Sequence, residues 1–477
     1  MDTKKLRQKI LDLAIRGKLV PQDPNDEPAS VLLERIRAEK ERLIKEGKIK
    51  RGKKSASDTP HYENEAPFKV PVSWEWTRLC DITALIEDCP HSTAKDEGSG
   101  YPLIRTPNVG EGHLLLDGVH RVSESVYNMR NARAIPETND IIYAREAPAG
   151  NAAVIKENEK VCLGQRTVLI RPFKEYVNSN LLAYFIISPY SRNLLISTAV
   201  GSTATHVNLE NIRPFTIPLP PFSEQLRIVS SIEKWFDAIE ALERDKNDLQ
   251  DSILKAKTKI LDLAIHGKLV SQDPNDEPAI ELLKRINPSF VPCDNAQYQY
   301  DIPDSWEWVK LLDIAISELG KTLDKGKNTG IPYNYLCAFN VKWHSFDLSV
   351  VKTILLEDNE LERYKVRKGD LLICEGGDVG RAAIWESNDT IYYQNALHRV
   401  RFKDAINQYY FLYVLQYYKS RGMIDDVSGG VTIKHFTQNS MKKLSFPLPP
   451  KEEQKRIVAK IEDLFAVLDE IQGFIEA

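Results

Sequence analysis

The chain has 477 residues, 42% of them hydrophobic, and a formal net charge of −4, a composition that suits a globular protein of two to four domains. The small acidic charge argues against a protein that holds nucleic acid by overall charge alone, because phosphate neutralisation needs a local surplus of lysine and arginine. The sequence shows no apolar run near the roughly 20 residues of a membrane span and no apolar signal-peptide core. We therefore expect a cytoplasmic protein without membrane contact.

The cysteines give no sign of a metal site or of a disulfide framework. They form no CxxC pair and have no regular spacing, which argues against a zinc ribbon and a disulfide scaffold. We expect reduced thiols and no bound metal. The cysteines are Cys80, Cys89, Cys162, Cys293, Cys337 and Cys374.

The N-terminal region, residues 1–69, begins with a charged helical pattern that places Leu6, Ile10 and Leu13 on one face. GKLV and QDPNDEPA then end this helix in turns, and ASVLLERI begins a short second helix. Residues 35–54 hold ten lysines and arginines against three acids. This basic stretch predicts a solvated basic helix or tether, either a plain exposed linker or a segment that contacts DNA or a partner.

The next segment, residues 70–220, is predicted to be a folded body with strands. It opens with PVSWEWTRLCDI, where Trp74 and Trp76 alternate as in a strand and are predicted to pack in the core or at an edge. NDIIYAREAPAGNAAVI at 139–155 predicts a strand, a turn and a strand, and LLAYFII at 181–187 is long enough for a buried helix. The body ends in PLPP, which must be extended.

The central region, residues 221–301, carries a long helix with apolar residues at strict 4,3 spacing, which is typical of a coiled-coil seam. Thirty-six residues at about 1.5 Å each give a rod of roughly 54 Å. Lys246 is the one polar residue in the seam. The predicted seam residues are Ile228, Ile232, Trp235, Ile239, Leu242, Leu249, Ile253 and Ile260.

A second body, residues 302–449, and a terminal helix, residues 450–477, repeat this plan. PDSWEWVKLLDI with Trp306 and Trp308 matches the first opening, and GDLLICEGGDVGRAAIW at 369–385 matches the first strand-turn-strand segment. The turn EGGDVG at 375–380 predicts a hairpin or, as the alternative, a phosphate cradle of backbone amides. The seam of the terminal helix is predicted to contain Ile457, Ile461, Leu464, Leu468 and Ile471.

The repeats are circularly permuted. Residues 9–36 recur at 259–286 with 23 of 28 positions identical and an offset of 250, whereas PLPPxxEQxRIV recurs at 218–229 and 447–458 with an offset of 229. One continuous segment in the middle of the chain is therefore cut in two at its ends. We predict that the central helix lies antiparallel to the two terminal helices and that the two bodies are related by a pseudo-two-fold axis.

No enzyme motif is convincing. The sequence contains no GxxxxGK[ST] phosphate loop, no HExxH, no GxSxG and no NPPF-type tetrapeptide of amino-methyltransferases; LPPF at 219–222 lacks the polar first residue. His206 and His435 recur in a shared GxTxxH, but neither has a second histidine or a carboxylate nearby in sequence. Loop capping or phosphate contact is expected of them, and no catalytic residue is predicted.

Polar and basic side chains in the variable parts of the bodies are candidate DNA contacts. Arginine and lysine suit guanine N7 and O6, and asparagine and glutamine suit adenine N6 and N7; a solvated surface residue is the alternative for each. Lysine plus arginine number 14 against 16 acids in the first body and 19 against 18 in the second. We therefore expect the two bodies to provide sequence specificity, and other patches or partners to provide most of the affinity for DNA. The candidates are Arg105, Asn108, Arg145, Arg166, Thr203, His206, Lys321, Lys325, Lys327, Asn340, Lys342, Arg381, Asn395, His398, Thr432, Lys434 and His435.

The order frame, body, frame, body, frame, together with the repeated KILDLAIxGKLVxQDPNDEPA, the SWEW openings and PLPPxxEQxRIV, resembles the specificity (S, HsdS) subunits of type I restriction-modification systems along essentially the whole chain. The resemblance implies an α+β fold with two α/β target-recognition domains separated by an antiparallel coiled coil. It also implies a bipartite, asymmetric DNA target, since two different readers cannot see a palindrome.

The resemblance further implies a non-catalytic subunit of a bacterial or archaeal complex. Its expected partners are double-stranded DNA, two modification subunits that use S-adenosylmethionine to methylate adenine, and restriction subunits that use ATP and magnesium. No cofactor is expected in this chain. Two other functions stay open from the residues: a non-enzymatic coiled-coil scaffold that binds proteins, and a self-contained methyltransferase or nuclease, which the missing motifs make improbable.

Overall fold

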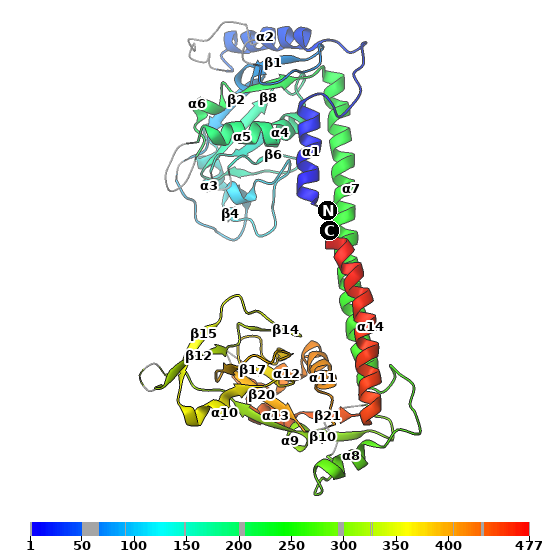
Figure 1. The fold of residues 1–477 in the computed structure, drawn as a ribbon. Helices are drawn as coiled ribbons and strands as arrows, with labels where there is room; N and C mark the ends of the chain where they lie inside the picture. The colour runs from blue at the N-terminus through cyan, green and yellow to red at the C-terminus, as the bar shows by residue number, and fades with distance from the viewer. Residues whose placement is uncertain are drawn as a thin grey trace. The chain divides into compact units, whose positions relative to one another are not determined.

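The computed structural model describes residues 2–49, 66–90, 92–146, 149–199, 206–293, 300–324, 326, 328–403, 405–430 and 434–476. The chain divides into two compact units, Met1–Asp245 and Lys246–Ala477. The division falls inside one uninterrupted helix, α7 (Phe222–Ile265), drawn in green in Figure 1. Each unit therefore contains one body together with the frame helices that adjoin it.

The first unit is a mixed α and β structure. Its strands form the sheets β2-β8-β5-β6 and β4-β3-β7 and the pair β1-β9. The helices before α7 are α1 (Thr3–Ile15), α2 (Ala29–Lys45), α3 (Glu124–Arg130), α4 (Ser179–Ile187), α5 (Pro189–Ser197) and α6 (Leu209–Ile212), with 3-10 turns η1 (Leu79–Asp81) and η2 (Thr106–Asn108). The strands are β1 (Glu75–Arg78), β2 (Thr83–Asp88), β3 (Tyr101–Ile104), β4 (Arg121–Val122), β5 (Ile141–Ala144), β6 (Ala152–Val154), β7 (Cys162–Leu163), β8 (Thr167–Pro172) and β9 (Thr216–Leu219).

The second unit has the same plan with additional strands. Its sheets are β11-β20-β17-β18 and β15-β12-β19-β16, with the pairs β10-β21 and β13-β14. The helices after α7 are α8 (Ala279–Ile286), α9 (Leu311–Ile314), α10 (Leu361–Tyr364), α11 (Gln408–Ser420), α12 (Met423–Val427), α13 (Gln438–Lys443) and α14 (Lys451–Glu476), with the 3-10 turn η3 (Asp358–Glu360). The strands are β10 (Glu307–Lys310), β11 (Ala315–Leu319), β12 (Ile331–Leu336), β13 (Val341–Lys342), β14 (Ser345–Phe346), β15 (Lys352–Leu356), β16 (Lys365–Val366), β17 (Leu371–Cys374), β18 (Ala382–Ile384), β19 (Ile391–Tyr393), β20 (Leu397–Phe402) and β21 (Ser445–Leu448).

The two four-stranded sheets β2-β8-β5-β6 and β11-β20-β17-β18 have the same strand order, and the antiparallel pairs β5-β6 and β17-β18 confirm the strand-turn-strand segments predicted from the sequence. LLAYFII forms α4, whose residues are largely buried, as its apolar run predicts. The PLPP segments are extended: Pro218 lies in β9 and Pro447 in β21, each opposite a tryptophan in a two-stranded pair, where a missing donor is tolerated.

The long helix buries part of the predicted seam, Ile228, Ile232 and Ile239, together with two residues outside it. In the first unit the buried apolar α7 residues are Ile228, Val229, Ile232, Phe236 and Ile239, which follow the 3.6-residue period of a helix packed on a globular core. They join one hydrophobic cluster with α1, α2, α4 and the sheet. The helix is anchored by the body as much as by a partner helix.

Part of the predicted seam therefore lies at the surface. Trp235 is 52% exposed, Leu242 is 40% exposed and Leu249 is 43% exposed. The other predicted positions are buried at Ile10, Ile253, Ile457 and Ile461, partly buried at Leu6, Leu13, Ile260, Leu464 and Leu468, and exposed at Ile471.

The two units contain matching pairs of antiparallel helices. In the first unit the Arg7 guanidinium of α1 lies 4.9 Å from the Phe236 ring of α7 and pairs with Glu240 at 3.6 Å. In the second unit Lys257 of α7 lies 5.4 Å from the Phe465 ring of α14 and pairs with Asp469. These residues are equivalent under the offsets 250 and 229, so the permuted sequence repeat is also a repeat of contacts.

The repeated EQxRIV motif ties each long helix to its frame. Glu224 is fully buried, and its carboxylate accepts hydrogen bonds from Trp74 Nε1 at 2.9 Å and Gln22 Nε2 at 2.6 Å. Arg227 pairs with Asp26 at 2.5 Å. The second unit repeats these contacts in the pairs Trp306–Glu453, Gln272–Glu453 and Arg456–Asp276. The SWEW tryptophans are buried, as the packing interpretation predicts.

Gly17→Ala is expected to lower the free energy of unfolding by about 2–4 kcal/mol, through left-handed strain and overpacking. Gly17 ends α1 with φ +67°, and a Cβ there lies 2.4 Å from Pro71 Cγ. Gly47 has φ +69° with nothing within 4 Å of a Cβ, so Gly47→Ala is the matched control and should cost only about 1 kcal/mol. Urea unfolding measures both; equal losses would contradict the packing argument.

Candidate nucleic-acid interface

Three backbone segments meet at one end of the four-stranded sheet in each unit. In the first unit the Arg145 N–H donates to the Arg166 carbonyl at 3.1 Å, and the Val207 N–H donates to the Arg145 carbonyl at 3.0 Å. We call residues 145–146, 164–166 and 206–207 the first loop cluster. In the second unit Glu375 N–H donates to the Ala396 carbonyl and Phe436 N–H to the Glu375 carbonyl, which defines the second loop cluster, residues 375–376, 394–396 and 434–436.

The first loop cluster brings together three of the predicted contacts. Arg145 lies directly after β5 and pairs with Asp88 at 3.2 Å. Arg166 adopts φ +68° and pairs with Glu146 at 2.9 Å, and a β-bridge joins Glu146 to His206. Arg166 keeps half of its side chain exposed, whereas Arg145 is largely buried. The exposed cation of this cluster, Arg166, is therefore already partly neutralised by Glu146.

The second loop cluster holds the predicted residues Asn395, Lys434 and His435. The Asn395 N–H donates to the Lys321 carbonyl at 3.0 Å, and the Lys321 ammonium pairs with Glu360. The Lys434 ammonium donates to the Asp425 carbonyl at 2.9 Å. His435 is exposed, and its backbone exchanges hydrogen bonds with Gly429. Among these residues His435 has the freest side chain.

Asn108 and Asn340 are corrected from base-reading candidates to loop anchors. Asn108 Oδ1 accepts from the Arg105 N–H at 3.2 Å and its Nδ2 donates to the Leu115 carbonyl. Asn340 repeats this with the Cys337 N–H at 3.0 Å and the carbonyls of Asp347 and Val350. Both side chains are buried. Their amide groups hold equivalent loops together and face the interior instead of solvent.

His398 is likewise interior. Its side chain is 1% exposed, its Nε2 lies 3.1 Å from the Phe436 carbonyl, and burial lowers its pKa to about 4. A neutral buried imidazole on β20 secures the loop of residue 436 and does not meet a base. The predicted DNA contact at His398 is therefore replaced by a structural role.

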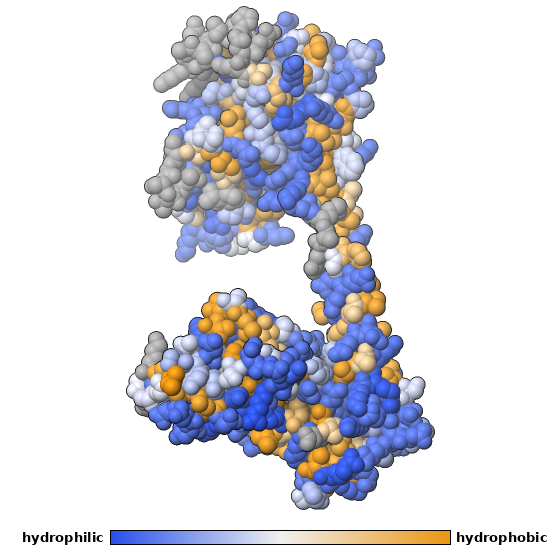
Figure 2. Space-filling model, in the orientation of Figure 1, coloured by the Kyte–Doolittle hydropathy of each residue, from blue (hydrophilic) through white to orange (hydrophobic). Residues whose placement is uncertain are grey.

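The remaining candidates lie on the variable loops. Arg105 is partly buried, and Arg381 donates to the Ala338 carbonyl at 2.8 Å and pairs with Asp378. Lys342 lies 4.7 Å from the ring of Phe339, which is 54% exposed. Figure 2 shows hydrophobic side chains at this surface, over the region of β14 and β15. Thr203, Lys325, Lys327 and Thr432 lie outside the described residues.

Sequence reasoning missed the acidic members of the loop clusters, Glu146 and Glu375. Glu375 follows β17 as Arg145 follows β5; burial raises the pKa of its carboxyl and nearby His435 lowers it. An alignment of the two strand-turn-strand segments would have placed Glu375 opposite Arg145. The predicted contacts included no carboxylates, although a carboxylate accepts a hydrogen bond from cytosine N4.

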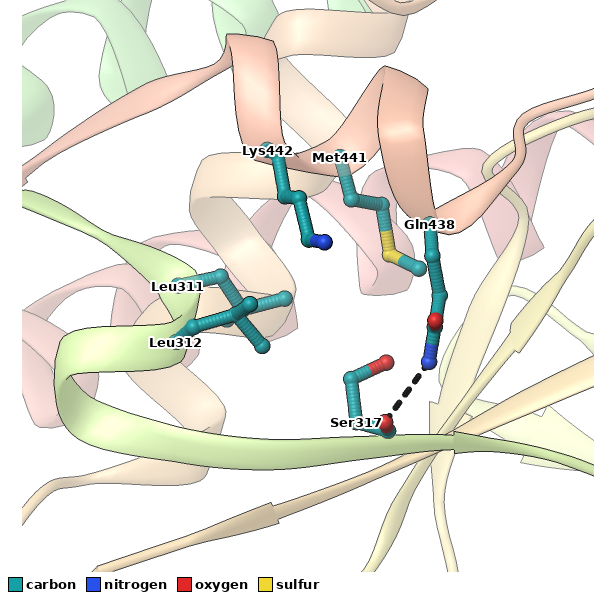
Figure 3. A pocket seen from close by; sticks show the side chains of 6 residues that line it. All are labelled: Leu311, Leu312, Ser317, Gln438, Met441 and Lys442. Carbon is teal, nitrogen blue, oxygen red and sulfur yellow. Dashed lines mark hydrogen bonds between the residues drawn. The ribbon is translucent and has the colours of Figure 1, made fainter.

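No pocket with catalytic chemistry stands out among the described residues. The pocket in Figure 3 is lined by two leucines, a methionine and three polar residues, and the Gln438 amide donates to the Ser317 carbonyl at 2.7 Å. No group of three or more His, Cys, Asp or Glu side chains in the described ranges is arranged to hold a metal ion. Within the same ranges no helix has both the length and the apolar character to cross a membrane.

Comparisons with known proteins support the resemblance to type I specificity subunits along nearly the whole chain. The family model "Type I restriction modification DNA specificity domain" matches residues 71–250 and 303–476. Two Escherichia coli proteins, the type I restriction enzyme EcoEI and EcoAI specificity subunits, are 27% and 28% identical over 99% of this chain, covering 91% and 90% of their own lengths.

One solved structure is similar enough to compare the folds. A chain from a structure that addresses complex assembly and conformational transition of the type I R-M system has a TM-score of 0.55 at 19% identity, over 86% of this chain and 96% of that one. At this identity the likeness shows the fold. With the family model covering both repeats, the chain belongs to the family of type I restriction-modification DNA specificity subunits.

Proposed function

We propose that each body of this specificity subunit reads one part of a split, asymmetric DNA target. The observation that carries the proposal is the pair of loop clusters, which share their backbone hydrogen bonds but differ in side chains. One scaffold used twice with unlike loops recognises two unlike half-sites. The alternative of a protein-only scaffold is not favoured by the family match.

We propose that the chain has no catalysis of its own. It directs adenine methylation by two modification subunits, which carry S-adenosylmethionine, and cleavage by restriction subunits, which use ATP and magnesium, in the cytoplasm of a bacterial or archaeal cell. The repeated frame contacts around Glu224 and Glu453 support two equivalent docking positions. The repeated frame would bind two identical modification subunits, and the two different bodies would read the two different halves of an asymmetric target.

In this proposal the loop clusters determine sequence specificity, and the partner subunits provide most of the affinity for DNA. The loop clusters contain ion pairs such as Arg166–Glu146 and Arg145–Asp88, so the bodies present little uncompensated positive charge. Binding strength would then come chiefly from phosphate contacts of the partner subunits. Gel-shift experiments with the co-expressed modification subunit should show sequence-specific retention that this chain alone does not give.

Exchange of residues 70–220 for the equivalent body of a relative is expected to change one half of the methylated sequence and leave the other half unchanged. The reason is that the first body and the second belong to separate compact units. Methylome sequencing of cells that carry the hybrid chain and its modification subunit reads both halves at once. Exchange of residues 302–449 is the matched control and should alter the opposite half. A change in both halves from either exchange refutes modular reading.

A further inference from the structure

The turns after β5 and β17 are closed by equivalent backbone hydrogen bonds. The Ala144 N–H donates to the Asn151 carbonyl, and the Gly150 N–H donates back to Ala144; Cys374, Arg381 and Gly380 repeat these bonds. The shared bonds place Arg145 and Glu375 at the same position, the first residue of a six-residue turn. The two bodies therefore carry side chains of opposite charge at one structural position.

The side chains that face these two turn positions also differ. Arg145 pairs with Asp88 at the end of β2, opposite Val168 of β8. Glu375 faces His398, which occupies the position of Val168 on β20, with Nε2 3.8 Å from the carboxylate. In the first body the turn supplies the cation, and in the second body it supplies the anion.

The Glu375 carboxylate is partly exposed. It is 19% exposed, and no other described side chain is recorded donating a hydrogen bond to it. Gly376 and Gly377 follow it, and a Cβ at Gly377 would meet nothing within 4 Å. The exposed His435 ring borders the turn, 3.7 Å from a Cβ at Gly376. The backbone that follows the carboxylate therefore carries no side chains at two positions and has open space at Gly377.

We propose that Glu375 is a specificity-determining residue of the second body, which accepts a hydrogen bond from an exocyclic amino group of a base in the major groove. This inference rests on the proposed function. An ionised carboxylate only accepts, and phosphates repel it. Among major-groove edges only cytosine N4 and adenine N6 donate, whereas guanine and thymine present acceptors. Glu375 therefore selects cytosine or adenine and rejects guanine or thymine at one position.

Arg145 cannot supply the same selection in the first body. Its guanidinium is paired with the Asp88 carboxylate at 3.2 Å, whereas the residue that faces Glu375 is a neutral histidine. In that body the exposed member of the cluster is Arg166, 53% exposed, which has an alanine, Ala396, as its equivalent in the second. The two half-sites are expected to differ in the base class read at this position.

The test uses the complex of the full chain with its modification subunit, on duplexes that carry every single base-pair substitution in both half-sites. Glu375→Gln has a donor as well as acceptors, so it should reduce discrimination against guanine or thymine at one base pair of the second body's half-site by roughly 5- to 150-fold. Other base pairs should change less than about twofold. Glu362→Gln, an exposed glutamate of α10, is the control and should leave all discrimination unchanged.

Glu375→Asp provides a second variant if the glutamine variant does not assemble. It keeps the charge but shortens the reach, and it should weaken discrimination at the same base pair without changing the preferred base. Unaltered discrimination at every base pair overturns the role of Glu375, as does an equal loss across both half-sites. If the wild-type complex shows no split target, the proposed function itself fails; a split target with an unaffected Glu375→Gln variant refutes the Glu375 inference alone.

Discussion

Glu224→Ala is expected to lower the free energy of unfolding by about 3–5 kcal/mol, among the largest effects of any single substitution in the frame. The buried carboxylate accepts from Trp74 and Gln22, so its removal leaves the buried Trp74 N–H without an acceptor and opens a cavity. Glu453→Ala should cost about the same in the second unit, where Trp306 and Gln272 donate. Urea unfolding followed by tryptophan fluorescence measures both losses.

The control is Glu240→Ala in the same helix. Glu240 is half exposed and pairs with Arg7 at 3.6 Å, a surface ion pair worth less than about 1 kcal/mol. Equal losses for Glu224→Ala and Glu240→Ala would mean that the repeated EQxRIV motif does not hold the frame together. A large loss only at Glu224 and Glu453 would explain why this motif is identical in both repeats.

The Glu224 contacts also have a pH signature. Burial raises the pKa of Glu224, although Trp74 and Gln22 lower it in part. A carboxyl with a raised folded-state pKa stabilises the fold most at pH values below its unfolded pKa, and this contribution declines as pH rises through the folded pKa. The deficit of Glu224→Gln relative to wild type should therefore shrink between about pH 4 and pH 7. A deficit that grows with pH would contradict the buried-carboxylate account.

Insertion of seven residues into α7 between Asp245 and Lys246 is expected to lengthen the gap between the two half-sites by about three base pairs. Seven residues add about 10.5 Å of helix, and B-DNA rises about 3.4 Å per base pair. They also complete nearly two turns, so the faces of α7 stay close to their original directions. The insertion point falls at the boundary between the compact units, outside the contacts of Arg7 and Lys257.

Methylome sequencing reads the gap directly. A seven-residue insertion after Gly47, an exposed turn beyond α2, adds the same number of residues without lengthening α7 and should keep the original gap. An unchanged gap with the α7 insertion, in a complex that still methylates DNA, would mean that α7 does not set the spacing.

The architecture of each unit was predictable from the sequence because its signals are local. Strand-turn-strand patterns placed β5-β6 and β17-β18, and apolar periodicity placed α4 and α7. The extent of the helix α2 was predictable in part: ASVLLERI suggested a short helix and the basic stretch after it a solvated helix or tether. The helix α2 continues to Lys45, because these basic residues are good helix formers.

The candidate interface was predictable only in part. Arg145, Arg166 and His206 stay predicted DNA contacts, and hydrogen bonds between distant segments bring them together in one loop cluster. Asn108, Asn340 and His398 have the same chemistry in sequence as the other candidates. Their side chains are occupied by backbone groups up to 38 residues away, and a sequence pattern does not specify such partners.

The sequence by itself determined that this chain is a permuted duplication with a shared frame and two unlike bodies, since repeats, offsets and periodicities are properties of residue order. Only the tertiary structure decided which residues face the core and which remain accessible. Trp235 fits a heptad seam yet lies at the surface, while Glu375, not among the predicted contacts, occupies the position equivalent to Arg145. Side-chain exposure depends on non-local packing, which periodicity along one helix or strand does not encode.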